Sequence, residues 1–225
     1  MPTSDHDPTA TLRPTTPEGY GEPVRFDYPL WLLVVLVLLL TPPAVLVGGW
    51  LLYHAQGPDL LALFAFEETE TGFSFTVVSG SIAVAFLVAV AGVTVAHELV
   101  HGLVYRLRGY EVSYGVAPHV GAFYVAAFHQ FQGRRDNLLV GIAPLVVLTP
   151  LLAGLVFVPS PLVAFGAFVA LVVNTAGSAG DLYLVARLLR LPDGTLMYDS
   201  DVRSSFVYRP AESGDGETVG VESQT

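Results

Sequence analysis

The chain has 225 residues, of which 52% are hydrophobic and only 13% are charged. Soluble globular domains carry about 25% charged residues, so this composition indicates a membrane protein. The absence of cysteine excludes disulfides and thiolate metal sites, and leaves His, Asp and Glu as metal ligands. The net charge is −10, and no basic patch is available to neutralise the phosphates of a nucleic acid.

The chain begins with a polar segment and then becomes strongly apolar. Residues 1–24 are rich in Pro, Thr and acidic residues, and we expect a disordered tail. The first predicted membrane span covers residues 28–53, with two adjacent prolines inside it and Trp and Tyr residues near its ends. Residues 54–78 are expected to form a loop, with a short interfacial helix at 59–66.

The second predicted span covers residues 79–105. Its uninterrupted apolar run, residues 82–96, gives only about 22 Å of helix, whereas the hydrocarbon core of a bilayer is about 30 Å thick. To cross the membrane, the helix must continue through the sequence His-Glu-Leu-Val-His. Three ionisable side chains are therefore expected inside the bilayer, near one end of the span.

The second half of the chain repeats this pattern. Residues 110–133 mix aromatic, β-branched and glycine residues, as is typical of a β-hairpin or a re-entrant strand. The third predicted span is 137–158. The fourth, 162–190, must continue beyond a short apolar run into Asn-Thr-Ala-Gly-Ser-Ala-Gly-Asp, because the apolar part gives only about 18 Å of helix. Residues 191–225 are polar and acidic, and are expected to be a mostly disordered tail.

The expected fold is an all-α polytopic membrane protein with about four transmembrane helices and a membrane-associated β-hairpin between the second and third. The membrane domain would cover residues 25–190. Arginines flank one end of every predicted span, and the 54–78 loop has none. By the positive-inside rule, both termini and the ionisable clusters then lie toward the cytoplasmic side of the cell membrane. The acidic, lysine-free composition is similar to that of proteins from salt-loving archaea.

The His-Glu-Leu-Val-His sequence is a candidate metal site. His97 and His101 share one face of a helix, and Glu98 lies beside them. In the His-Glu-x-x-His pattern two imidazoles bind zinc, and the glutamate transfers the protons of a zinc-bound water. Ionisable residues inside a membrane are costly and mark functional sites. The alternative is a histidine pair hydrogen-bonded within a helix bundle, with Glu98 as its partner.

A catalytic zinc needs three protein ligands and one open position. Asp181 is the main candidate for the third ligand. It precedes Arg187 by about as many residues as His101 precedes Arg106. Asp181 and the two histidines are therefore expected at similar membrane depth. The alternative for Asp181 is an ion pair with an arginine at the end of the helix.

Other polar residues are candidates for a supporting role. Asn174, Ser178 and Asp181 form one polar stripe on the fourth span. The first two are expected either to hold substrate and orient Asp181, or to make helix–helix hydrogen bonds. Further candidates for a third ligand or an oxyanion donor lie in the expected hairpin: Glu111, His119 and His129.

The pair of motifs, HELVH in one span and NTAGSAGD in a later one, resembles the zincin peptidases of the DUF3267 family. These are similar to the site-2-protease class of intramembrane zinc metalloproteases. The resemblance covers about residues 79–190. It implies zinc as the cofactor, His97, His101 and Asp181 as its ligands, and Glu98 as the catalytic carboxylate. In the site-2 proteases the aspartate has an Asn-Pro-Asp-Gly-like context, so here the resemblance supports the metal site more than proteolysis.

The expected function is an intramembrane zinc metallopeptidase that hydrolyses a peptide bond of a membrane protein or membrane-associated peptide. Asn174, Ser178 and His119 are expected to contact substrate or support the ligands. Two alternatives come from other classes. One is a zinc-binding membrane scaffold or regulator without peptidase activity, and the other is a small transporter.

Overall fold

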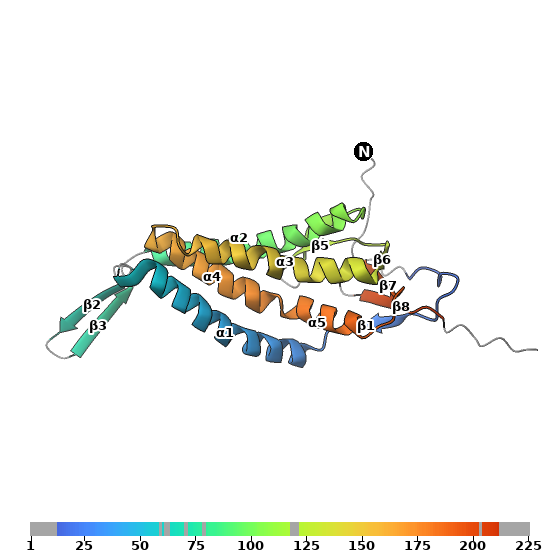
Figure 1. The fold of residues 1–225 in the computed structure, drawn as a ribbon, viewed down its shortest axis with the longest axis horizontal. Helices are drawn as coiled ribbons and strands as arrows, with labels where there is room; N and C mark the ends of the chain where they lie inside the picture. Colours follow the sequence, from blue (N-terminus) through green and yellow to red (C-terminus); the bar gives the residue numbers. More distant parts are fainter. Residues whose placement is uncertain are drawn as a thin grey trace, which may run out of the picture.

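The computed structural model describes residues 13–58, 60, 64–69, 72–77, 80–117, 122–202 and 204–211. Five helices run roughly along the long axis of the molecule (Figure 1). Their bounds are α1 Leu30–Gln56, α2 Gly80–Leu107, α3 Arg134–Leu155, α4 Pro161–Gly177 and α5 Ala179–Leu189.

Four stretches of the described chain are long and apolar enough to cross a membrane, counting α4 and α5 together as Pro161–Leu189. They correspond to the four predicted spans, with ends that differ by a few residues. The helix α2 does continue through His-Glu-Leu-Val-His, and reaches about 42 Å. The polytopic helical architecture is therefore plausible from the structure as well as from the sequence.

The expectation of an all-α fold is wrong, because the described residues include eight strands. A four-stranded sheet has the order β1-β8-β7-β6, and two hairpins are formed by β2 with β3 and by β4 with β5. The strand bounds are β1 Val24–Phe26, β2 Phe64–Thr69, β3 Gly72–Val77, β4 Ser113–Ala117, β5 Ala122–Ala126, β6 Phe131–Gly133, β7 Leu196–Asp201 and β8 Ser204–Tyr208.

Three of these strand groups bear directly on the expectations. The hairpin β4–β5 lies within residues 110–133, as expected. The helix expected at 59–66 is wrong over 64–66, where β2 begins. Phenylalanines occupy alternate positions along β2 and β3, which is a strand pattern, but the leucines just before β2 obscure it in the sequence. The expectation of a disordered tail is wrong over 196–208, because β7 and β8 are held in a sheet between β1 and β6.

The helix α4 occupies the centre of the bundle and packs against α1, α2 and α3 (Figure 1). Its Ala170 and Leu171 are buried against Val93 of α2 and Leu148 of α3. Gly48 of α1 allows close packing on α4, because a Cβ there would lie 2.9 Å from the Leu171 side chain. This central position lets residues near the end of α4 contact both α2 and α3.

The four-stranded sheet lies at one end of the bundle, and the hairpin β2–β3 lies at the other (Figure 1). Buried hydrogen bonds join the sheet to α2. The Tyr105 hydroxyl donates to Gln132 Oε1 (3.0 Å), and Gln132 Nε2 donates to Ala127 O (2.9 Å) and Asp199 Oδ2 (2.9 Å). Burial raises the pKa of the Asp199 carboxyl, and hydrogen bonds from Ser205 and Gln132 oppose that rise.

Gln132 should contribute strongly to stability, because its fully buried amide serves three partners. We expect Gln132→Leu to lower the free energy of unfolding by roughly 1–3 kcal/mol, since it leaves buried polar groups without partners. Thermal or denaturant unfolding in detergent micelles measures this. The matched control is Gln130→Leu, which removes exposed hydrogen bonds to the backbone of Glu111 and a longer, 3.3 Å one to Phe128 O, and should change stability less than about 0.5 kcal/mol. Equal losses in the two variants would contradict the assigned role.

Candidate metal centre

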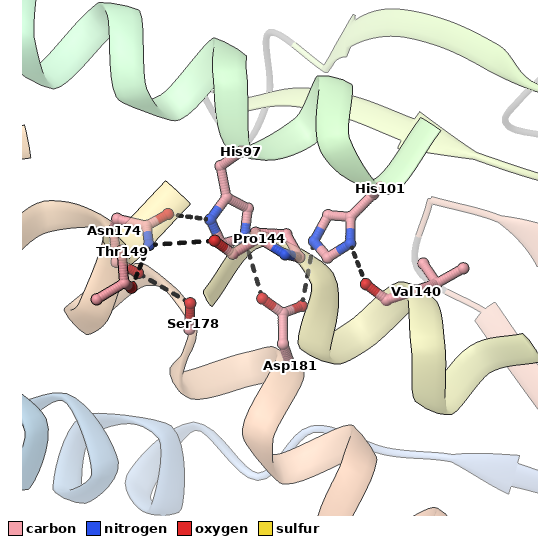
Figure 2. A network of polar contacts seen from close by, with 8 residues as sticks. All are labelled: His97, His101, Val140, Pro144, Thr149, Asn174, Ser178 and Asp181. Atoms are coloured by element: carbon pink, nitrogen blue, oxygen red, sulfur yellow. Dashed lines mark hydrogen bonds and ion pairs between the residues drawn. The ribbon is translucent and has the colours of Figure 1, made fainter. Parts of the chain in front are cut away.

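The two histidines of α2 are buried side by side, with ring centroids 4.9 Å apart. Each ring uses Nδ1 for a hydrogen bond that leads away from the other ring (Figure 2). His97 Nδ1 lies 3.0 Å from Asn174 Oδ1, and His101 Nδ1 lies 2.9 Å from the backbone oxygen of Val140. Both partners are acceptors, so each Nδ1 carries the proton and each Nε2 of a neutral ring presents a lone pair.

Asp181 of α5 faces both Nε2 atoms (Figure 2). Its Oδ2 lies 3.0 Å from His97 Nε2, and its Oδ1 lies 3.4 Å from His101 Nε2. Two lone pairs and a carboxylate directed at one another repel, unless one or more protons or a metal ion lie among them. With metal–ligand distances near 2.0–2.1 Å, neighbouring ligands of a tetrahedral zinc are about 3.3 Å apart, close to both separations.

The donor set fits zinc. Two imidazoles and a carboxylate are a known ligand set of catalytic zinc sites, and the imidazoles disfavour Mg²⁺ and Ca²⁺. Ligand atoms of His97, Glu98 and His101 also lie within 4.8 Å of one another. The carboxylate of Glu98, like that of Asp181, is therefore near enough to be the third ligand. We propose Asp181 for the third position, because its two oxygens approach both Nε2 atoms, whereas the Glu98 carboxylate lies near the Val125 backbone.

Glu98 lines a small cavity beside the histidines. The cavity has a volume of about 130 Å³ and is bounded by α2 and α4, with His97, Thr94, Asn174 and Gly177 among its lining residues. A single water needs about 30 Å³, so several waters fit. Strand β5 packs against α2, and its Val125 backbone lies near the Glu98 carboxylate. Glu98 can therefore contact both water and a segment that lies along β5.

Asn174 connects His97 to α3. Its side-chain Nδ2 lies 3.4 Å from both the Pro144 oxygen and Thr149 Oγ1, which orients Oδ1 toward His97 (Figure 2). Such hydrogen bonds fix the tautomer and the ring plane of a metal-binding histidine. Ser178 lies in the same stripe, but its hydroxyl donates to Asn174 O at 2.9 Å, and its backbone joins the end of α4 to α5. Asn174 thus orients a candidate ligand, whereas the hydroxyl of Ser178 bonds within its own chain segment.

The other candidates lie elsewhere or outside the described residues. His119 is outside them. His129 has φ 57° and lies by the four-stranded sheet, where its Nε2 is 2.8 Å from Ser200 O and its ring stacks on Tyr198. The side chain of Glu111 is exposed, and its backbone pairs with Gln130. Neither His129 nor Glu111 joins the cluster.

Sequence reasoning missed three contributors to this centre: the Val140 carbonyl, the Pro144 carbonyl and Thr149. Backbone acceptors have no side-chain signature, and a threonine in an apolar span usually bonds within its own helix. The only available signal was a proline inside the third span, since proline leaves a carbonyl of its helix without a donor.

Loss of a candidate ligand should weaken zinc binding more than loss of a residue that only orients a ligand. We expect Asn174→Ala to raise the Kd for zinc about 10- to 100-fold, as loss of an outer-shell partner does, and Asp181→Ala to raise it further. Zinc titration against a competing chelator in detergent measures both. The control is Asp193→Ala, which removes only a surface ion pair with Arg134 and should leave Kd unchanged. Unchanged affinity in Asp181→Ala would exclude Asp181 as a ligand.

Comparison with known proteins gives one match. Neither the curated proteins nor the solved structures contain a significant match. The family model of DUF3267, described as "Putative zincin peptidase", matches residues 90–196. That range contains both histidines of α2, Glu98, Asn174 and Asp181. The chain is therefore similar to the DUF3267 family over residues 90–196, just under half of its length.

Proposed function

We propose that the chain is an intramembrane zinc metallopeptidase, which cleaves a peptide bond of a membrane protein or membrane-associated peptide. The observation that carries the proposal is the convergence of His97, His101 and Asp181, with Glu98 beside them, on helices apolar enough to cross a membrane. The match to this family, described as a zincin peptidase family, supports zinc-dependent peptide hydrolysis at the coarse level. The placement of that chemistry inside a bilayer is our own inference.

Zinc, when bound here, supplies Lewis-acid activation of water and of the scissile carbonyl. Glu98 transfers the protons. As the water oxygen bonds to the carbonyl carbon, the Glu98 carboxylate takes one water proton, and it delivers a proton to the amine nitrogen as the C–N bond breaks. Asn174 and the Val140 carbonyl hold the two rings throughout, so the ligand geometry need not rearrange during the reaction.

Strand β5 is suited to hold the substrate. Within the described residues β5 pairs only with β4, and it packs against α2. Gly102, which follows His101, permits that packing, because a Cβ there would lie 2.7 Å from a Val125 methyl group. A helical substrate must unwind before its peptide bond can be attacked, and an unwound segment can add to the free edge of a strand. The edge of β5 beside Glu98 is the place we propose for it.

We propose that the sheet end of the molecule faces the cytoplasm. The ends of α2, α3 and α5 that lie near the sheet have the arginines Arg106, Arg108, Arg134, Arg135, Arg187 and Arg190. The positive-inside rule places such ends in the cytoplasm, together with both termini. His101 and Asp181 lie only two turns from those arginines, so water would have a short route to the site from that side.

Glu98→Gln separates a peptidase from a non-proteolytic zinc protein. We expect the variant to bind zinc as the wild type does and to lose cleavage by at least about 100-fold, because the amide cannot accept the proton of water. The measurement compares membrane proteomes of cells that express either form, searching for fragments made only by the wild type.

The matched control is Glu111→Gln, a change at an exposed side chain just beyond α2, which should leave the fragments unchanged. If the fragments persist in Glu98→Gln, the proposed mechanism is wrong. If zinc binds and no fragment depends on the wild type, the scaffold alternative is favoured.

A further inference from the structure

The helix α3 contains two prolines, Pro144 and Pro150. A proline has no backbone N–H, so the carbonyl four residues earlier loses its helical hydrogen-bond donor. In α3 the affected carbonyls are those of Val140 and Val146. An unpaired carbonyl in apolar surroundings is costly, and membrane helices tolerate proline where a neighbouring group supplies a replacement donor.

The replacement donor for Val140 is a candidate zinc ligand. His101 Nδ1 lies 2.9 Å from the Val140 oxygen, and this contact crosses from α2 to α3 (Figure 2). If residue 144 had an N–H, that group would compete for the same oxygen and draw the carbonyl back along the helix axis. The proline therefore leaves the carbonyl available to His101, and His101 satisfies the carbonyl that the proline leaves unpaired.

The same turn of α3 adjoins the other two candidate ligands. The Pro144 oxygen accepts from Asn174, whose Oδ1 holds His97. A Cβ on Gly141 would lie 3.6 Å from the Asp181 backbone oxygen, so this turn also packs against the start of α5. A change in the conformation of residues 140–144 would thus affect the surroundings of both histidines and Asp181.

We infer that Pro144 is a positioning residue of the metal centre. It acts through the Val140 carbonyl, which fixes the tautomer and ring plane of His101 so that Nε2 faces the metal. It does not contact the metal itself. The inference rests on the proposed function only in requiring that His101 binds a metal; it does not require that the protein cleaves peptides.

Pro150 provides a matched control within the same helix. Its missing N–H affects the carbonyl of Val146, whose side chain is exposed on the outer face of α3. The described residues give no hydrogen bond between Val146 and the metal centre. Replacing Pro150 should therefore have the same kind of effect on the helix backbone without touching a ligand.

The test measures zinc affinity of the full chain in detergent for the wild type, Pro144→Ala and Pro150→Ala. We expect Pro144→Ala to raise the Kd for zinc about tenfold, at the lower end of the range for outer-shell partners, and Pro150→Ala to leave it within twofold. Pro144→Val provides a second variant, because it restores the N–H and refills most of the buried ring volume. The d–d spectrum of bound Co²⁺ should shift in the Pro144 variants alone.

Without metal, Pro144→Val should be no less stable than the wild type, because it gains a helical hydrogen bond and keeps most of the buried volume. This separates positioning from folding, since a structural role would lower metal-free stability and leave the cobalt spectrum unchanged.

If the wild type binds zinc and both Pro144 variants bind it within twofold, the inference is overturned while the metal site stands. If Pro150→Ala loses as much affinity as Pro144→Ala, the inference is also overturned. A wild type that binds no zinc overturns the metal site itself.

Discussion

The candidate metal centre depends on one electrostatic constraint: two imidazole lone pairs and a carboxylate face one another in an apolar bundle, and they repel unless protons or a metal ion lie between them. The Nδ1 hydrogen bonds of His97 and His101 to Asn174 and Val140 create that constraint, because they commit both protons to the far sides of the rings. If either bond were lost, the ring could change tautomer and relieve the repulsion by donating to Asp181. We propose that the tautomers, in addition to the motif, suit this cluster to binding a metal ion.

The fold supplies each part of that arrangement from a different helix. The helix α2 provides the rings, α3 a backbone carbonyl, α4 the Asn174 amide and α5 the Asp181 carboxylate (Figure 2). The central position of α4 makes this convergence possible, because it packs against both α2 and α3. Beyond the site, the buried Gln132 amide joins Tyr105, one turn past His101, to the sheet. The rotation of α2 about its axis is therefore restrained one turn past His101.

Helix lengths made much of this predictable. The apolar run before His97 and the run before Asn174 are each too short to cross a bilayer alone. Both polar clusters were therefore expected within membrane-spanning helices. Their spacing from the nearby arginines predicted that the two clusters lie at similar depth. The strands β7 and β8 were missed because a short strand in an acidic tail is stabilised by pairing with distant strands, and residues near it in sequence give no sign of this. The Val140 carbonyl was missed because a backbone oxygen has no signature, although Pro144 implied that it was available.

Zinc K-edge X-ray absorption on purified protein would test the central claim most directly. The account predicts one zinc per chain, with about two imidazole nitrogens and one or two oxygens at roughly 2.0–2.1 Å and the outer-shell scattering typical of imidazole rings. Loss of one imidazole from that signal in His97→Ala would assign it to the cluster. A protein that holds no zinc, or a zinc whose surroundings contain no imidazole, would contradict the account.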